Sequence, residues 1–122
     1  MDLAKKLFKS EFADVRPISG VVANLAIYSA FSNPGDVMIA PSIPAGGHIS
    51  HGKKEHSGTA GLVHGLEIEF FAFDSEEMNI DVEKTKTKVE ELKKQDRLPK
   101  IAMFGGSVFL LSLIHICRCR RA

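Results

Sequence analysis

The sequence has little cysteine and almost no net charge, and both shortages exclude classes of function. Its 122 residues include two cysteines, Cys117 and Cys119, which are separated by a single residue near the end. This spacing is too tight for an ordinary disulfide framework, so nothing indicates a secreted, disulfide-stapled domain. Sixteen basic residues balance fifteen acidic ones, for a formal charge of +1. The chain therefore has no strong overall electrostatic field that would attract a nucleic acid or an acidic membrane. Small-molecule partners are expected instead.

Long apolar runs and a secretory leader are also missing. No segment approaches the roughly 20 apolar residues that a membrane-spanning helix needs. Residues 1–8 (MDLAKKLF) lack the apolar core of a signal peptide and are typical of a short amphipathic helix. The hydrophobic content of 44% and charged content of 25% are those of an ordinary globular domain. We therefore expect a cytoplasmic protein without a membrane span.

Helical and strand patterns alternate along the chain. In order, the sequence predicts a helix over residues 21–31, a strand over 37–40, a strand over 67–73, a helix over 82–94 capped by Asp81, and a strand over 101–104. The helix over residues 21–31 is apolar on nearly every side, which predicts that other parts of the protein pack around it. The short apolar runs 37–40 and 101–104 predict buried strands. This alternation predicts an α/β fold with a mainly parallel sheet flanked by helices.

Turns and loops separate these elements. Residues 33–36 (NPGD) predict a type II turn, with glycine where the backbone needs positive φ. Residues 42–65 have no sustained hydrophobic periodicity and therefore predict a loop with at most a short helical turn. A loop of this length is usually functional. Paired glycines, Gly46–Gly47 and Gly105–Gly106, follow two of the strands. They are expected at the carboxyl edge of the sheet, where ligands collect.

Two groups of residues could carry chemistry. Ser19–Gly20 precedes the apolar helix, so a hydroxyl and free amides could bind an anion there; an ordinary helix cap without a ligand is the alternative. Four histidines crowd one loop, namely His48, His51, His56 and His64. They could bind zinc or perform acid–base work, although no Cys or acidic partner stands at ligand spacing. An imidazole could also stack on an aromatic cofactor.

The last twelve residues differ in character from the rest. Residues 111–122 follow without a turn signal and hold both cysteines and a burst of arginine. A single Cys-x-Cys lacks the partners of a tetrahedral metal site, and three arginines make a poor nucleic-acid patch. The string resembles the translation of a sequencing-library adaptor, which fold reasoning should exclude. We therefore expect residues 1–110 to be part of one domain and 111–122 to be a non-native tail.

Three linked motifs resemble a known family. They are Ser19-Gly20-x-x-Ala23-Asn24, Asn33-Pro34-Gly35-Asp36 and Gly46-Gly47-His48-Ile49-Ser50-His51-Gly52. In order and spacing they resemble serine hydroxymethyltransferase, most of all its archaeal branch, from about Phe12 to Phe109. The resemblance implies part of the large domain of a fold-type I transferase that depends on pyridoxal phosphate. It further implies serine and glycine as substrates, tetrahydrofolate or tetrahydromethanopterin as one-carbon carrier, and a homodimeric parent protein.

The same resemblance implies roles for individual residues. Ser19 and Gly20 would hold the cofactor phosphate, and Ser107 would lie near the phenolic oxygen of the cofactor ring. His48 would stack on that ring as the catalytic residue. Three further residues, Ile43, Gly47 and Ile49, would approach the pterin carrier, and no metal site is implied.

The chain also departs from the family pattern. Val21 stands where many members have a second phosphate-binding hydroxyl, and Ile18 stands where they have histidine. The lysine that binds the cofactor covalently, the aspartate that pairs with its ring nitrogen and the arginine that receives the substrate carboxylate all lie beyond the region covered. The chain alone is therefore expected to be inactive. The alternatives are another fold-type I enzyme, such as an aldolase or aminotransferase, and a non-catalytic module that binds a phosphorylated ligand.

Overall fold

A computed structural model describes residues 1–51 and 60–106. In chain order its elements are α1 (Asp2–Phe8), α2 (Gly20–Phe31), β1 (Val37–Ala40), the 3₁₀ turn η1 (Ile49–His51), α3 (Ala60–His64), β2 (Glu67–Phe70), β3 (Phe73–Asp74), β4 (Asn79–Ile80), α4 (Val82–Lys94) and β5 (Ile101–Ala102). A helix precedes each strand of the main sheet: α2 precedes β1, α3 precedes β2 and α4 precedes β5. Helix α3 forms where the sequence predicted a loop with at most a short helical turn. No helix in these two stretches has the length and apolarity needed to cross a bilayer.

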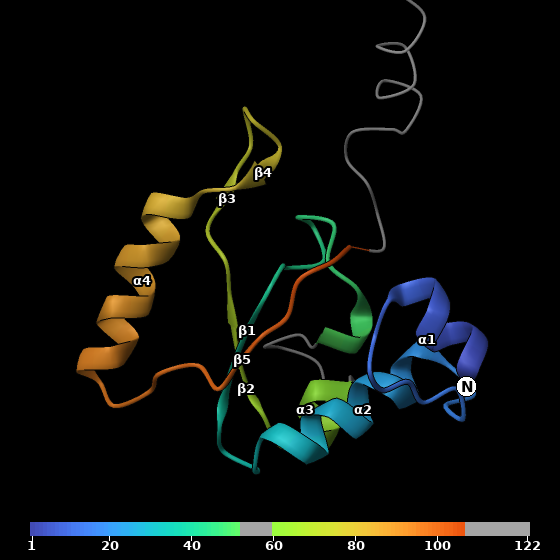
Figure 1. Cartoon of the computed structure of the whole chain (residues 1–122). Coiled ribbons are helices and arrows are strands. Elements are labelled where there is room, and N and C mark those ends of the chain that lie inside the picture. The colour runs from blue at the N-terminus through green and yellow to red at the C-terminus, as the bar shows by residue number, and fades with distance from the viewer. Residues whose placement is uncertain (52–59, 107–122) are drawn as a thin grey trace, which may run out of the picture.

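Three parallel strands form the main sheet, in the order β2-β1-β5. In the register, Val37 lies opposite Glu67, and Ile39 lies opposite Ala102. All four residues of the central strand β1 are buried. Figure 1 shows α4 on one side of this sheet and α2 and α3 on the other. The structure therefore confirms the predicted α/β fold with a parallel sheet flanked by helices.

The core lies between β1, β2 and the pair α2 and α3. Its buried members are Tyr28, Met38, Leu66 and Ile68, and partly buried hydrophobic residues from α2, α3 and β5 pack around them. Gly61 of α3 lies so close that an added Cβ would be 3.0 Å from the Ile68 side chain and 3.1 Å from that of Met38. A side chain at this position would push α3 away from the sheet.

The turn between α2 and β1 has the predicted geometry. Gly35 has φ of 92°, and the N–H of Asp36 donates to the carbonyl of Asn33 at 3.0 Å. Positive φ costs a residue with a Cβ about 1–2 kcal/mol, which explains the glycine. The N–H of Gly35 also donates to the carbonyl of Gly65 at 2.8 Å, so the turn is tied to the chain that enters β2.

The second predicted strand is shorter than expected. Residues 67–73 were predicted as one strand, but β2 ends at Phe70. Beyond it, the N–H of Ala72 donates to the Thr85 hydroxyl at 3.1 Å, and its carbonyl accepts from Asp81. These bonds to the start of α4 replace the bonds of a sheet ladder. The chain then forms the small β3–β4 hairpin, which the sequence analysis missed.

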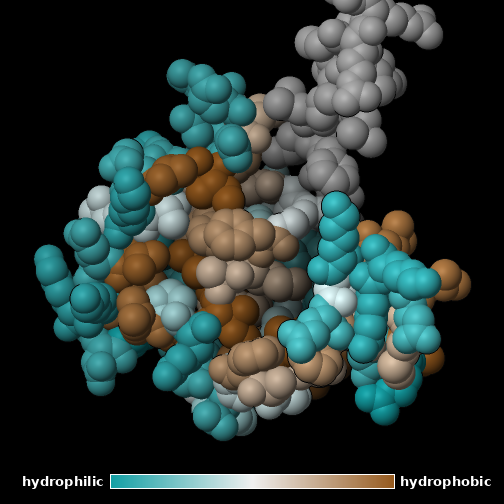
Figure 2. Space-filling model, in the orientation of Figure 1, coloured by the Kyte–Doolittle hydropathy of each residue, from teal (hydrophilic) through white to brown (hydrophobic). Residues whose placement is uncertain are grey.

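Two predictions of burial were wrong. In α2 only Tyr28 is buried, whereas Ile27 is 50% exposed and Phe31 is 69% exposed. The strand β5 is half-buried at Ile101 and exposed at Ala102. The reason is the same in both places, because no segment among the described residues packs over these faces. Figure 2 accordingly shows apolar side chains reaching the surface in the middle of the molecule.

Helix α4 begins where the sequence predicted. The Asp81 carboxylate accepts from the N–H of Lys84 at 2.9 Å, and this hydrogen bond is the main reason that the pKa of Asp81 is lowered. Of the predicted inward stripe, Leu92 is buried, Thr85 and Val89 are half-buried, and Val82 is 57% exposed. The stripe therefore becomes progressively less covered toward the start of the helix.

Candidate functional site

Ser19 caps the first turn of α2. Its Oγ accepts from the N–H of Val22 at 3.2 Å, and its carbonyl accepts from the N–H of Ala23 at 3.1 Å. The N–H groups of Gly20 and Val21 are first-turn amides, which have no partner within a helix. Ser19 and Gly20 are exposed. Free amides and the positive end of the helix dipole together make this a place that attracts an anion.

Replacing Ser19 with alanine removes the side-chain cap and is expected to lower the free energy of unfolding by about 1 kcal/mol. Aspartate caps a helix about as well as serine, so Ser19→Asp is the matched control and should change stability by only a few tenths of a kcal/mol. Urea unfolding of the three proteins measures both effects. Equal losses in the two variants would contradict the capping role of the hydroxyl.

The turn around Gly46 and Gly47 folds back onto the end of β1. The N–H of Gly47 donates to the carbonyl of Ser42 at 2.8 Å, and Gly46 has φ of 90°. An added Cβ on Gly47 would lie 2.2 Å from the carbonyl oxygen of Pro41. Only glycine fits there, so the turn delivers the following histidine directly beside the strand end.

A chain of hydrogen bonds joins His48 to helix α2. The side-chain nitrogen of Asn24 donates to Ser50 Oγ at 2.8 Å, and Ser50 Oγ lies 2.7 Å from His48 Nδ1. The Tyr28 hydroxyl donates to the Ser50 carbonyl at 3.1 Å, and burial raises the pKa of this hydroxyl. Asn24 lies five residues after Ser19, a rise of about 7.5 Å along the helix. The first half of α2 therefore both follows the cap Ser19 and positions His48.

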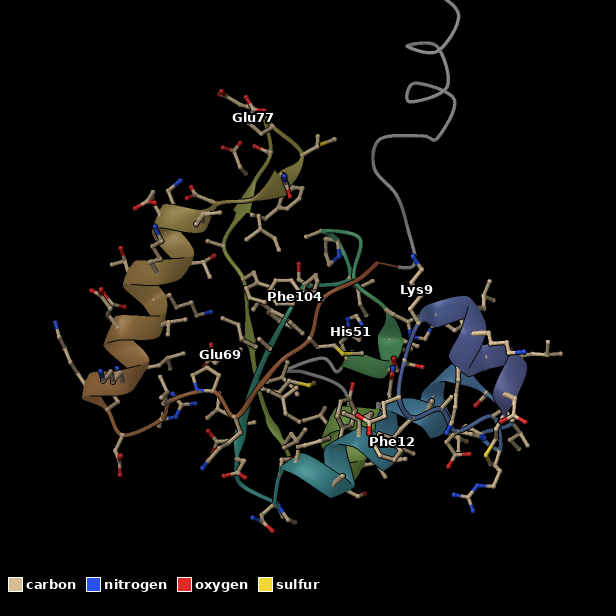
Figure 3. All side chains as sticks on the ribbon, in the orientation of Figure 1. Lys9, Phe12, His51, Glu69, Glu77 and Phe104 are labelled. Atoms are coloured by element: carbon tan, nitrogen blue, oxygen red, sulfur yellow. The ribbon has the colours of Figure 1, made fainter. Side chains whose placement is uncertain are left out.

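His51 lies under His48 in the interior. It is 4% exposed, and its ring centroid is 6.1 Å from that of His48 in an edge-on arrangement. Among the described residues, its Nδ1 has no hydrogen-bond partner. Burial, and secondarily the charge of His48, lowers the pKa of His51. Figure 3 shows His51 on the side of the sheet opposite α4. The ring is therefore expected to be neutral at physiological pH.

The lowered pKa of His51 predicts that the fold weakens in mild acid. Below the ordinary value of 6.5, the unfolded chain takes up a proton that the native ring does not, so stability falls as the pH falls toward the native pKa. The slope contributed by this one proton is at most about 1.4 kcal/mol per pH unit. Urea unfolding between about pH 8 and 5 should show this slope of the unfolding free energy against pH. The H51Q variant should have a smaller slope. An unchanged slope in H51Q would assign the effect to another group.

The other candidate residues are distributed around this turn. Ile43 is half-buried, Gly47 is buried and Ile49 is 55% exposed, whereas Ser107 lies outside the described residues. His56 also lies outside them, and His64 Nε2 is 3.3 Å from the Ser32 carbonyl. Within residues 1–51 and 60–106, no three His, Cys, Asp or Glu side chains are grouped to hold a metal. The structure thus gathers Ile43, Gly47, His48 and Ile49 in one turn.

Sequence reasoning gave no role to the residues that hold His48. Asn24 stood out as the single strongly polar residue of an apolar helix, and Ser50 lay within the third motif, but no spacing rule pairs them. Ser50 is 1% exposed and Tyr28 is 0% exposed. A polar residue within an apolar helix needs a buried partner, and that is the signal that could have directed attention to Asn24.

Comparison with known proteins decides the family. The model of the family described as serine hydroxymethyltransferase matches residues 1–121. This chain belongs to that family. Over 110 residues it is 84% identical to the serine hydroxymethyltransferase of Nitrosopumilus maritimus and 79% identical to that of Cenarchaeum symbiosum. It is 48% identical to that of Methanothermobacter marburgensis over the same length.

These matches confirm the resemblance to serine hydroxymethyltransferases, including archaeal ones. In each of the two most similar of these relatives the match covers 90% of this chain but 25% of the relative. The chain therefore spans about a quarter of the length of the curated relatives it matches. Family membership and the α/β fold are established for this quarter.

Proposed function

We propose that this chain is part of a serine hydroxymethyltransferase that interconverts serine and glycine, with pyridoxal phosphate as cofactor and a reduced pterin as one-carbon carrier. Family membership supports the reaction. The observation that carries the site assignment is the hydrogen-bonded chain from Asn24 through Ser50 to His48, because it joins the predicted ring-stacking residue to the helix whose first turn would receive the phosphate.

The start of α2 fits a phosphate group. The amides of Gly20 and Val21 are first-turn donors, and both Ser19 and Gly20 are exposed. The Ser19 hydroxyl accepts from Val22, so its own proton can be donated to a phosphate oxygen. With Val21 in place of a second hydroxyl, the backbone amides would carry more of the binding. Ser107 stays a proposed neighbour of the cofactor ring.

His48 is suited to hold an aromatic ring in one orientation. It is half-buried, the glycine turn places it, and two bonds from Ser50 orient it. When bound, pyridoxal phosphate supplies an electron sink for the carbanion of the amino-acid substrate. The imidazole ring would restrict the position of the cofactor by covering one of its faces. Such positioning contributes more when the site is preorganised than when the groups move freely in water.

The carrier would lie next to the same turn. Ile49 is 55% exposed and follows the half-buried His48, while the buried Gly47 lets the turn pack closely against the backbone of Pro41. Together with Ile43 these residues offer an apolar edge to a pterin ring. They do not select between tetrahydrofolate and tetrahydromethanopterin, so both carriers belong in the assay.

We propose further that the functional protein continues beyond Leu110 and that residues 111–122 are an adaptor-derived tail. The chain spans a quarter of its relatives, and its apolar faces are open. One such face is a hollow of about 380 Å³ between α4 and the ends of β2 and β5, lined among others by Phe71, Val89 and Phe104. Among the described lysines, Lys86 is paired with Glu83 on the surface of α4 and has no feature of a covalent cofactor site.

The decisive experiment resequences the source DNA past the codon for Leu110 and expresses the continuous reading frame. We expect a homodimeric cytoplasmic enzyme that binds pyridoxal phosphate and forms glycine from serine with one of the two carriers. The 122-residue chain alone should form none. A protein that binds the cofactor but releases no glycine with either carrier would favour an aldolase or aminotransferase of the same fold.

Variants of Ser19 separate cofactor binding from stability in this enzyme. Ser19→Ala should weaken pyridoxal phosphate binding because it removes a donor. Ser19→Asp should weaken it more, since a carboxylate caps the helix but repels the phosphate. Cofactor absorbance titrations measure both. If the two variants bind as tightly as the parent enzyme, the phosphate does not bind at this helix.

A further inference from the structure

The direction of the hydrogen bonds around His48 follows from the chemistry of the groups. A side-chain amide nitrogen and a backbone N–H can only donate. The backbone N–H of Ser50 lies 3.0 Å from His48 Nδ1 and therefore donates to it. Asn24 donates to Ser50 Oγ, which leaves the Ser50 proton to be donated to the same Nδ1 at 2.7 Å.

The contact from the Ser50 backbone requires Nδ1 to be an acceptor, because a backbone N–H can only donate. In a neutral imidazole one nitrogen accepts and the other carries the proton, so the proton of His48 must lie on Nε2. The backbone donor alone demands this, whichever way the Asn24 amide is turned. Among the described residues, Nε2 of His48 makes no hydrogen bond of its own. Its N–H is thus available to a ligand.

We propose that Asn24 and Ser50 are positioning residues that lock His48 in the Nε2–H tautomer, so that its ring gives a ligand a flat face and one N–H donor. The neutral ring then has no free lone pair and cannot take a proton from the substrate. Proton removal in the reaction therefore belongs to another group. The identity of the ligand rests on the proposed function, whereas the tautomer does not.

Burial of Ser50 makes the hydrogen bonds that fix the His48 tautomer rigid. Ser50 is 1% exposed, and its carbonyl also accepts from the Tyr28 hydroxyl at 3.1 Å. Turning Ser50 away from His48 would break bonds at both its side chain and its backbone, in a region with little water to replace them. A fixed tautomer would let His48 distinguish a ligand oxygen, which accepts, from a ligand group that donates.

The test reads the tautomer directly in the 122-residue chain. With ¹⁵N-labelled histidine at about pH 9, far above the ordinary pKa of histidine, long-range ¹H–¹⁵N correlations distinguish the two neutral forms. The H48Q variant identifies the signals of His48. We expect essentially one form, Nε2–H, for His48. An equal mixture or the Nδ1–H form would overturn the proposal, and this measurement needs no other variant to fold.

Two variants then test the positioning residues. In Asn24→Asp the new carboxylate can only accept, so the Ser50 hydroxyl turns to it and leaves Nδ1; Ser50→Ala removes the hydroxyl outright. Each should lower the ratio of Nε2–H to Nδ1–H about fivefold, the effect of losing one ordinary hydrogen bond. Ser29→Ala, at an exposed serine on the same helix, is the control and should leave the ratio unchanged.

Unchanged ratios in both folded variants would show that Asn24 and Ser50 do not position the ring. Because the chain is measured without cofactor or substrate, this failure is distinct from failure of the proposed function, which the serine-to-glycine assay reports. A locked tautomer in a protein without that activity would retain the inference and reject the proposed reaction.

Discussion

Gly47→Ala is expected to lower the free energy of unfolding by about 3 kcal/mol, at the upper end of the cost of overpacking. The new Cβ would lie 2.2 Å from the Pro41 oxygen and 2.8 Å from the Ser42 oxygen. Both neighbours are backbone atoms, so no side-chain rotation can relieve the clash. The 2.8 Å bond from the Gly47 N–H to the Ser42 carbonyl would be lost or lengthened. Urea unfolding measures the loss.

Gly20→Ala is the matched control for this prediction. A Cβ on Gly20 would meet nothing within 4 Å, and alanine is the best helix former at a helical position. That variant should be as stable as the parent chain or up to about 1 kcal/mol more stable. Similar losses in the two variants would mean that the turn at Gly47 is loose enough to accept a side chain.

The second large effect is expected on the other side of the sheet, at Lys88. Its ammonium lies 3.0 Å from Glu69 Oε2 and donates to the Phe70 carbonyl at 2.7 Å. The Glu69 side chain is 11% exposed and lies between the sheet and α4, as Figure 3 shows. Lys88→Met keeps the aliphatic stem but leaves a buried carboxylate with less compensation. A loss of about 2–3 kcal/mol is expected, below that of a fully isolated pair because Arg97 lies 3.3 Å from Glu69.

Lys86→Met controls for the general effect of removing a lysine from α4. Lys86 pairs with Glu83 at 2.8 Å, but both side chains are mostly exposed. Exposed pairs contribute little, so no measurable change in unfolding is expected. Adding Glu69→Gln to Lys88→Met should recover part of the loss, because the buried carboxylate charge that lost Lys88 disappears. If both single lysine variants behave alike, solvent screens Glu69 more than its burial indicates.

Local patterns were sufficient to predict most elements. The capping chemistry of Asp81, the proline–glycine turn before β1 and the continuous apolar run 37–40 each act through neighbours in sequence, and each prediction was confirmed. The strand over 67–73 was overextended because its aromatic composition continues past Phe70. Where β2 ends depends on Thr85 and Asp81 of α4, which bind the backbone of Ala72. No local pattern contains that information.

The candidate site divides in the same way. The sequence by itself determined the family, the capped start of α2 and the glycine turn, because motif order, helix capping and the room around a glycine turn are encoded by residues close together in the chain. Only the tertiary structure decided that Asn24 reaches Ser50, twenty-six residues later, that His51 is buried and that much of α2 is open. The physical reason is that hydrogen-bond direction and burial depend on which distant segments meet, and residue spacing along the chain does not specify that.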